Sequence, residues 1–348
     1  MVECPPRTRE VGGSSPPRST IPSSKSVKSS IPRTGGVKVP EAKYIWLDGR
    51  LVPWAQATTH LMTHSLHYGT AVFEGIRGYS SAPGGGGELN VFRLLDHMRR
   101  LEASAKIYGF PLRYSPEELA SATLELLRAN ELHEDVYIRP LSYLGYGTIG
   151  LVFSDIEPHV AIIAFPYGKY FHKDGLNVMV STWRRICQEA TPPAAKVSGH
   201  YVNSVLAKME ALRHGFDDAL MLDSRGYLSE ATGENVFLVR GGTLVTPPPS
   251  AGILEGITRD TLIRLAREEG IPVEVRDVSR HELYVADEVF LAGTAAEVTP
   301  VLSVDGRTVG SGRPGPVTSR LRALYESVAR GSDPRHPEWR TPVYGRGT

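Results

Sequence analysis

The stretch PPAAKVSGHYVNS (Pro192–Ser204) places one lysine, Lys196, among small residues, with Tyr201 five positions later. Lysine is scarce in this chain, which has nine lysines against 30 arginines in 348 residues. A catalytic amine must reach a carbonyl, and it needs a lowered pKa or a preformed imine to react near neutral pH. The small neighbours Ala195 and Gly199 would leave room for a flat ring. By itself the segment favours a surface-loop lysine, so other segments must decide between the two interpretations.

The bulk composition is that of a globular protein, with 41% hydrophobic and 22% charged residues. A net charge of +1 gives no reason to expect nucleic acid or an anionic membrane as a partner. No apolar run approaches the ~20 residues that a membrane helix needs. The two cysteines, Cys4 and Cys187, lack the spacing of a metal or redox motif. We therefore expect a reducing compartment and a cytoplasmic location.

Residues 1–40 differ from the rest of the chain, because they are rich in Ser, Pro, Gly and basic residues. Such a segment cannot bury enough apolar surface to fold, so we expect it to be disordered. An Arg- and Ser-rich start is also found in transit peptides, but the prolines argue against an amphipathic helix. A non-functional extension or an early start codon is favoured. We then expect a small domain over 41–165, a linker over 166–175, a large domain over 176–330 and a tail over 331–348.

Local patterns predict strands and helices in mixed order, which favours an α+β fold over a doubly wound one. Hairpins are predicted over 43–54, 75–94, 219–231 and 288–301, with the first turning at Asp48-Gly49 and the third at Asp223–Gly226. Further strands are predicted over 136–146, 159–168 and 176–183. A helix is predicted over 96–108, with Met98, Leu101 and Ala105 buried, and a second begins after Ser115 as its cap residue. A third is predicted over 201–214, with a buried side made of Val202, Val205, Leu206, Met209 and Leu212. A fourth helix is predicted to begin at a cap at Thr258.

A glycine-rich segment, Gly145-Tyr146-Gly147-Thr148-Ile149-Gly150, matches the pattern G-x-G-x-x-G. A dinucleotide site needs a helix directly after the glycines and an acid about 20 residues on. Here a strand is predicted instead, so we interpret the segment as a flexible loop that borders a pocket.

Three other segments offer what a cofactor-bound lysine requires. Glu230 ends a predicted strand and could place an anion beside a pyridine nitrogen. Thr258 begins a predicted helix, where free N–H groups favour a phosphate. The turn AGTAAE (292–297) offers a hydroxyl and backbone N–H groups, a possible nest for a carboxylate. Each has an ordinary structural alternative: a solvated acid, a plain helix cap, a packed turn.

Taken together, these segments resemble the branched-chain-amino-acid aminotransferases, which are fold-type IV pyridoxal-phosphate enzymes. The resemblance runs from about Tyr44 to Arg322. It implies two domains, a smaller N-terminal α/β domain and a larger C-terminal one with a β-barrel-like core. The matching motifs, in family order, are HYGTAVFEGIRGY (67–79), HMRRL (97–101), YIRP (137–140), FPYGKY (165–170), AAKVSGHY (194–201), YLSEATGEN (227–235), GITRD (256–260) and AGTAAE (292–297).

The resemblance implies that pyridoxal 5'-phosphate is the cofactor and that Lys196 forms the internal aldimine and then carries the proton as general base and acid. Glu230 would pair with the pyridine nitrogen, and Tyr201 with the ring hydroxyl. The helix pattern alone suggests a surface position for Arg100, and only the HMRRL match selects it over Arg99. Glu234 is either a supporting acid or a turn acid. The implied phosphate ligands are Arg100, Ile257, Thr258 and Thr294.

The implied substrates are leucine, isoleucine or valine with 2-oxoglutarate, which give branched 2-oxo acids and glutamate. The α-carboxylate would meet Thr294 and Ala295, with help from Tyr137. Arg139 would receive the distal carboxylate of glutamate; its ordinary alternative is a structural ion pair. The other implied pocket residues are Tyr68, Phe73, Gly75, Tyr167 and Tyr170.

The glycine loop departs from the sequence usual in bacterial relatives, so Tyr146 and Ile149 could reshape the pocket. In the family this loop lines the pocket, partly from a neighbouring subunit, and we expect a homodimer or homohexamer. Three alternatives on the same fold stay open: a D-amino-acid or (R)-amine transaminase, an aminodeoxychorismate lyase, and a non-catalytic homologue. No metal is expected.

Overall fold

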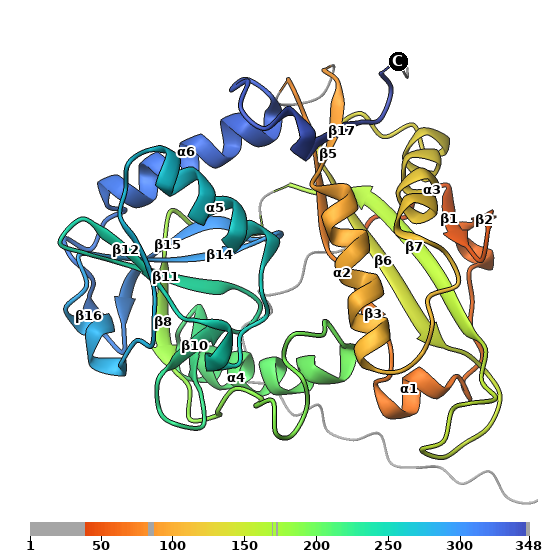
Figure 1. The fold of residues 1–348 in the computed structure, drawn as a ribbon, viewed down its shortest axis with the longest axis horizontal. Coiled ribbons are helices and arrows are strands. Elements are labelled where there is room, and N and C mark those ends of the chain that lie inside the picture. The colour runs from red at the N-terminus through yellow and green to blue at the C-terminus, as the bar shows by residue number, and fades with distance from the viewer. Residues whose placement is uncertain (1–38, 83–86, 169, 172, 346–348) are drawn as a thin grey trace, which may run out of the picture.

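Two β-sheets lie next to each other, each with its own helices, in the computed structural model, which describes residues 39–82, 87–168, 170–171 and 173–345 (Figure 1). Most strand pairs are antiparallel, and strands and helices follow no regular βαβ order. The predicted α+β class is therefore confirmed. The extension expected over residues 1–40 lies outside the described residues except for its last two positions.

The first sheet is built mainly from hairpins of residues 44–166. Its predicted turn at Asp48-Gly49 is confirmed, and both residues have the positive φ angles, 47° and 91°, that such a turn requires. The second predicted hairpin is also confirmed, although its tip at 83–86 lies outside the described residues. In spatial order the sheet contains β17 (Arg340–Pro342), β5 (Leu89–Phe92), β4 (Ile76–Ser80), β6 (Val136–Leu144), β7 (Pro158–Pro166), β1 (Tyr44–Leu47) and β2 (Arg50–Pro53), with β3 (Val72–Phe73) paired to β6.

Two long helices, α2 (Leu94–Ile107) and α3 (Pro116–Ala129), cover one face of the first sheet (Figure 1). α2 begins two residues before its predicted start, and its predicted buried residues Met98, Leu101 and Ala105 are fully buried. The Ser115 cap is confirmed, because its side chain and that of Glu118 form a capping box. The short helix α1 (His64–Tyr68) precedes β3.

The second sheet curls around its own apolar core. Both of its predicted hairpins, at 219–231 and 288–301, are confirmed. Its core is made of strand residues such as Val178, Leu220 and Leu291. In spatial order the strands are β10 (Leu228–Ala231), β9 (Asp218–Leu222), β8 (Leu176–Val180), β15 (Glu297–Val304), β14 (Glu288–Gly293), β11 (Asn235–Arg240), β12 (Thr243–Thr246) and β13 (Val273–Val275), with β16 (Arg307–Thr308) paired to β15.

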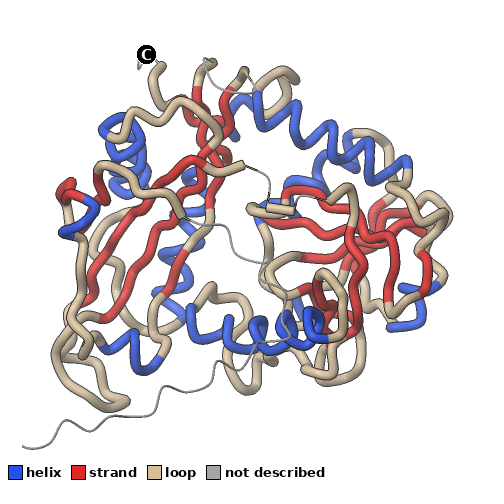
Figure 2. The backbone as a smooth tube through the Cα atoms, turned by 180° about the vertical axis from the view of Figure 1, so that it is seen from behind, coloured by secondary structure: helices blue, strands red, loops and turns tan. Residues whose placement is uncertain are grey.

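Helices α5 (Ile257–Glu268) and α6 (Pro316–Arg330) pack on the second sheet, and α4 (Tyr201–Arg213) lies at its other end (Figures 1 and 2). The predicted cap at Thr258 is wrong by two positions, because Gly256 is the cap residue of α5. The one-turn 3-10 helices are η1 (Trp54–Gln56), η2 (Ser198–His200), η3 (Pro249–Ala251), η4 (Arg280–Tyr284) and η5 (Pro337–Trp339).

The predicted buried face of α4 is also wrong. Ala207 and Ala211 pack against β9, because their small side chains let the helix approach the sheet closely. Val202, Val205 and Leu206, which we expected in the core, are 63%, 57% and 40% exposed. Met209 and Leu212 are partly buried, so three of the five predicted residues face away from the sheet.

The chain crosses between the sheets more often than a plain two-domain division implies. Strand β17 returns from the C-terminal region to the edge of the first sheet, while Trp339, just before it, packs in the core of α5 and α6. The predicted domain boundaries therefore stay predictions. Among the described residues, no helix is long and apolar enough to cross a membrane.

Candidate functional site

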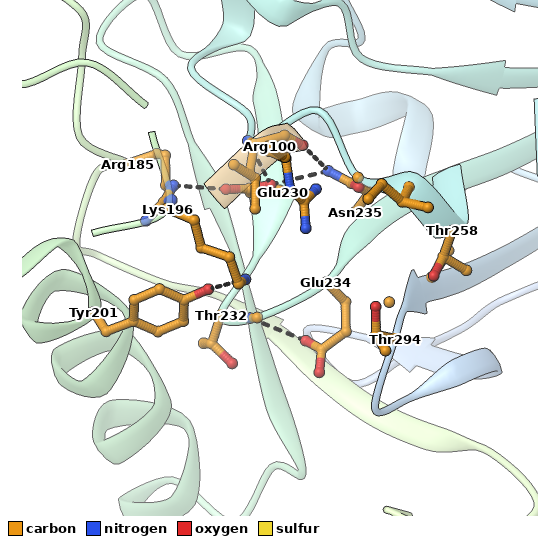
Figure 3. A pocket seen from close by; sticks show the side chains of 16 residues that line it. Arg100, Arg185, Lys196, Tyr201, Glu230, Thr232, Glu234, Asn235, Thr258 and Thr294 are labelled. Carbon is orange, nitrogen blue, oxygen red and sulfur yellow. Dashed lines mark hydrogen bonds and ion pairs between the residues drawn. The ribbon is translucent and has the colours of Figure 1, made fainter. Parts of the chain in front are cut away.

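A pocket lies between the two sheets, and all of the predicted cofactor-binding residues line it (Figure 3). Its walls come from α2, the lysine segment, the β10–β11 connection, the start of α5 and the turn after β14. Elements far apart in the sequence therefore build one site. The predicted residues found there are Arg100, Lys196, Tyr201, Glu230, Ile257, Thr258 and Thr294.

The lysine is paired with the tyrosine that the sequence indicated. Lys196 Nζ donates a hydrogen bond to Tyr201 Oη at 2.6 Å, and the Tyr201 ring packs against Phe73 at 5.0 Å between centroids. The Lys196 carbonyl accepts from the Phe73 backbone N–H at 3.1 Å. The amine is thus held at the end of a segment that is bonded to the first sheet.

The small residues around Lys196 have a packing role, and the expected clearance for a ring stays a prediction. Ala195 and Val197 are buried in the apolar core of the first sheet. A Cβ on Gly69 would lie 2.8 Å from Gly199 Cα, so two glycines are needed where these backbones meet. Small side chains let the lysine segment pack against residues 69–73.

Glu230 is a buried carboxylate with three partners. Its Oε2 accepts from Asn235 Nδ2 at 3.0 Å and from the Leu254 N–H at 3.1 Å, while Oε1 lies 2.8 Å from Arg185 Nε. Burial raises the pKa of Glu230, and Arg185 opposes that shift. These bonds fix the orientation of the carboxylate in a water-poor part of the pocket.

The start of α5 forms an anion-binding end of the pocket. The cap residue Gly256 offers no side-chain acceptor, so the first N–H groups, including those of Ile257 and Thr258, lack a cap partner. The hydroxyl-bearing residues Thr258 and Thr294 line the same end. Free N–H groups and the helix dipole favour a phosphate there.

Arg100, and not its neighbour, faces the pocket. Its Nε and Nη2 donate to the two oxygens of Glu74 at 2.7 and 2.8 Å, and Nη1 donates to the Glu255 carbonyl at 2.9 Å. Burial acts to raise the pKa of Glu74, but Arg100 and His97 outweigh it and hold this pKa well below its usual range. Arg99 is 60% exposed and lies 3.9 Å from Glu117. Arg100 is therefore the one of the two that lines the pocket, and its role as a phosphate ligand stays a prediction.

Among the predicted substrate residues of the first sheet, Phe73 lies next to Lys196, with its ring centre 5.0 Å from Nζ, and the others follow in a row of contacts that starts at Phe73. The guanidinium of Arg139 lies 4.7 Å from the centre of the Phe73 ring and donates to Tyr137 Oη at 2.7 Å. Its buried Nε has no hydrogen-bond partner within the part of the chain that the structure describes. A Cβ on Gly75 would lie 2.2 Å from Tyr137 Oη, so the absence of a side chain at this position leaves room for the tyrosine hydroxyl. The Tyr137 ring also packs on Tyr167 at 5.2 Å.

Of the nine predicted substrate residues, all of which the structure describes, only Thr294 lines the lysine pocket itself, and three of the others line separate cavities. Tyr170 and Ala295 line a smaller cavity beside it, and burial together with Glu234 raises the pKa of Tyr170. Tyr68 packs on His64 at 4.5 Å and lines an open groove with Trp183 and Leu206. Within one chain, Tyr68 is therefore separated from the other predicted residues.

The glycine loop also lies away from the lysine pocket. Its Tyr146 and Ile149 are 65% and 67% exposed, and His64 Nε2 contacts the Gly150 carbonyl at 2.8 Å. Strand β7 follows the loop, so the helix that a dinucleotide site requires is missing at this point, as predicted.

Several residues that line or support the site carried no signal of their own in the sequence. Arg185 pairs with Glu230, Asn235 bridges Glu230 and the Leu254 carbonyl, and Glu74 holds Arg100. Asn235 lies five residues after Glu230, within the YLSEATGEN motif, and could have been proposed from it. The part of the chain that the structure describes holds no group of three or more His, Cys, Asp or Glu residues arranged for a metal.

The pocket thus combines a primary amine, a buried carboxylate and a cationic, hydroxyl-rich anion site. This donor set fits a cofactor with a carbonyl, a protonated ring nitrogen and a phosphate. The amine can accept and return a proton beside the carbonyl carbon.

Comparison with known proteins gives the same class. The model of the class IV amino-transferases matches residues 71–304. A branched-chain-amino-acid aminotransferase of Escherichia coli (strain K12) is 47% identical over 296 residues, 84% of this chain and 94% of that protein. This chain therefore belongs to the class IV aminotransferase family.

Within that family, solved structures that this chain resembles include branched-chain aminotransferases. The enzyme of Thermoproteus uzoniensis with norvaline has a TM-score of 0.83 at 45% identity, covering 87% of this chain and 100% of that one. The enzyme of Thermobaculum terrenum in its PLP form has a TM-score of 0.83 at 44% identity, covering 88% of this chain and 99% of that one. The chain groups with the branched-chain-amino-acid aminotransferases, as its motifs predicted.

Proposed function

We propose that this protein is a pyridoxal-phosphate-dependent transaminase that transfers the amino group of L-leucine, L-isoleucine or L-valine to 2-oxoglutarate. The products are the branched 2-oxo acid and L-glutamate. The observation that carries the proposal is the 2.6 Å contact of Lys196 Nζ with Tyr201 Oη in the pocket that also holds Glu230 and the start of α5. Relatives at 44–47% identity that are named as branched-chain aminotransferases support the substrate class.

The residues present fit the cofactor at both of its charged ends. Arg100, Thr258, Thr294 and the N–H groups of Ile257 and Thr258 supply the cation and donors for a phosphate. Glu230 supplies the negative charge that keeps a pyridine nitrogen protonated, and its raised pKa favours sharing a proton with that nitrogen. When bound, the cofactor supplies a ring that accepts the electron pair released as the substrate Cα–H bond breaks.

Lys196 is the base that takes the proton from the substrate Cα and delivers it to C4′ of the cofactor. Tyr201 orients the amine through their hydrogen bond and meets the ring hydroxyl. The Phe73 ring, 5.0 Å from Lys196 Nζ, excludes water from the amine on one side.

Arg139 is the group that recognises the distal carboxylate of glutamate and 2-oxoglutarate. Among the described residues its buried Nε has no hydrogen-bond partner, so it can donate to an incoming carboxylate. Phe73, Tyr137 and Tyr167 provide apolar surface for a branched side chain. Thr294 and Ala295 receive the α-carboxylate at the turn after β14.

The protein acts as a homo-oligomer in which a second copy covers the open groove. Val202 and Leu206 of α4 line that groove together with Trp183, which is 46% exposed. Val205, on the same helix, is also exposed. Apolar residues gathered on one face are typical of an interface. Tyr68 lines the same groove, so it contributes to the pocket of the neighbouring copy. Whether two or six copies assemble, and the cytoplasmic location, stay predictions.

A donor panel tests the reaction. With 2-oxoglutarate as acceptor, L-Leu, L-Ile and L-Val should give the highest rates. Higher rates for D-amino acids with pyruvate would instead identify a D-amino-acid transaminase, and release of pyruvate from aminodeoxychorismate would identify a lyase.

A lysine variant tests the site. Lys196→Ala should lose both the visible absorption of the bound cofactor and transamination, down to the background rate, because no other amine replaces it. The control Lys106→Ala, at an exposed position of α2, should match the wild-type protein. A Lys196→Ala protein that still transaminates would contradict the assignment.

A further inference from the structure

The reactive lysine is held by a different part of the molecule from the rest of its pocket. Ala195 and Val197, on either side of it, are buried in the core of the first sheet, and the Lys196 N–H donates to Ser104 Oγ of α2 at 3.0 Å. Glu230 and Thr258 belong to the second sheet and its helix. The distance from the amine to the remaining site therefore depends on what fixes the segment 195–200.

One side chain at the end of that segment makes an unusual set of contacts. The imidazole of His200, only 7% exposed, has its Nε2 2.7 Å from Tyr108 Oη and 2.6 Å from Thr191 Oγ1. The two hydroxyl oxygens lie 2.7 Å from each other. Tyr108 is the cap residue at the C-terminal end of α2, so His200 connects the lysine segment to that helix. Through Thr191, His200 also connects to the loop that precedes the lysine segment.

The hydrogen bonds of this group are satisfied when the imidazole is neutral and its proton lies on Nδ1, because Nε2 can then accept from a hydroxyl. Burial and Arg185 lower the pKa of His200 to about 4, so the ring is neutral near pH 7. Nε2 then accepts from one hydroxyl, and the other hydroxyl donates to the first.

We infer that His200 is a positioning residue for Lys196, because its ring ties the lysine segment to Tyr108 at the end of α2 and to Thr191. His200 directly precedes Tyr201, and its N–H donates to the carbonyl of Val197, the residue just after Lys196, at 3.1 Å. His200 therefore restrains both partners of the Lys196–Tyr201 hydrogen bond. The inference rests on the proposed function, in which the Lys196 amine reacts with the cofactor carbonyl and later transfers the substrate proton.

The contacts indicate what loss of the ring changes. Without the ring, the Tyr108 and Thr191 hydroxyls keep their hydrogen bond to each other, but the segment 195–200 loses the tie of His200 to the end of α2 and keeps the bond from Lys196 N–H to Ser104 of that helix. The amine then samples more positions relative to Tyr201 Oη. A small displacement of a reacting group lowers a rate strongly.

The test uses His200→Ala with His214→Ala as the matched control, since His214 is exposed at the other end of α4. The first readout is the rate at which the visible band develops when cofactor-free protein is mixed with pyridoxal phosphate. The second is the pH midpoint of that band in the holoenzyme. His200→Ala should slow the development of the band by about tenfold and shift its pH midpoint, while His214→Ala should match the wild type in both. A folded His200→Ala protein with unchanged rate and midpoint would overturn the inference.

Tyr108→Phe removes one hydroxyl with little change in volume and serves if the alanine variant does not fold. It should slow band formation less than His200→Ala does, and the double variant should be no slower than His200→Ala alone, because both changes break the same tie. Wild-type rate and midpoint in Tyr108→Phe, or fully multiplying effects in the double variant, would contradict the clamp. A wild-type protein that forms no visible band would instead refute the proposed function.

Discussion

At the scale of single residues, Glu234 is the buried acid whose role the sequence left open. It lines the lysine pocket near Thr232 and Thr294, so it is more than a turn acid (Figure 3). Burial and the neighbouring Asp218 raise the pKa of Glu234 to about 8, against the attraction of Lys208. At neutral pH the carboxyl is mostly protonated, which avoids placing a second negative charge beside an anion site.

Replacing this acid should stabilise the protein at alkaline pH. A raised carboxyl pKa favours the folded state below pH 4.5, and this contribution is lost as the pH rises toward 8. In protein prepared without cofactor, Glu234→Gln should therefore raise the Tm by a few degrees at pH 8.5 and much less at pH 5. Calorimetry at both pH values measures this. The control Glu125→Gln, at an exposed position of α3, should leave the Tm unchanged at both pH values. An equal rise of the Tm at both pH values in Glu234→Gln would refute the assigned protonation.

Arg139 allows a second test at the same scale. Arg139→Ala removes a donor to the distal carboxylate, and a hydrogen bond to a charged group is worth roughly 1.5–3 kcal/mol. The KM for 2-oxoglutarate should therefore rise by about tenfold or more, while the KM for leucine changes little. Steady-state kinetics with each substrate varied in turn gives both numbers. Equal losses for the two substrates would mean that Arg139 is only structural.

At the scale of elements, the start of α5 depends on a close fit with β11. A Cβ on the cap residue Gly256 would lie 2.1 Å from Asn235 Oδ1, and Asn235 also holds Glu230. The two charged ends of the proposed cofactor site are therefore coupled through one amide side chain.

Gly256→Ala should weaken cofactor binding although its backbone φ of −69° suits alanine. The added methyl displaces Asn235, so Glu230 loses one of its three partners. We expect about a tenfold loss of affinity, the cost of a buried polar group losing a partner. Asn235→Ala should show a similar loss. Gly168→Ala, where a Cβ meets nothing within 4 Å, is the control. Equilibrium titration with pyridoxal phosphate measures the affinities, and unchanged binding in Gly256→Ala would refute the coupling.

At the scale of the whole molecule, the two sheets build the pocket but leave an apolar groove open. The groove includes Tyr68, Trp183 and Leu206, from α1, the loop after β8, and α4. α1 and the glycine loop form one unit at this groove's end of the molecule, because the His64 N–H donates to the Gly145 carbonyl at 2.9 Å. A second copy on this face would bury the groove and receive Tyr68.

A charge on α4 should separate the copies. Val205→Asp places a carboxylate in the proposed interface, and burying it without a partner is costly. Analytical ultracentrifugation should therefore show a shift toward monomer, with a lower specific activity at the same concentration. Val285→Asp, at a position that is 57% exposed just after η4, is the control. An unchanged oligomer in Val205→Asp would place the interface elsewhere.

Much of the fold and chemistry could be predicted from local patterns. The turn at Asp48-Gly49, the capping box of Ser115 and the pair Lys196–Tyr201 each depend on residues that are close in the chain. The family motifs added Glu230 and Thr294. For these features, the spacing along the chain already brings the necessary atoms together.

The tertiary structure alone decided the features whose partners are distant in the chain. Arg100 faces the pocket because Glu74, 26 residues away, is buried there to receive it. α4 turns its alanines to β9 and its larger residues outward because close packing against the sheet admits only small side chains. Tyr68 lies apart from Lys196 because α1 packs at the groove and not at the lysine pocket. The sequence by itself determined which chemical groups the site contains, and the packing of the two sheets determined which of them meet.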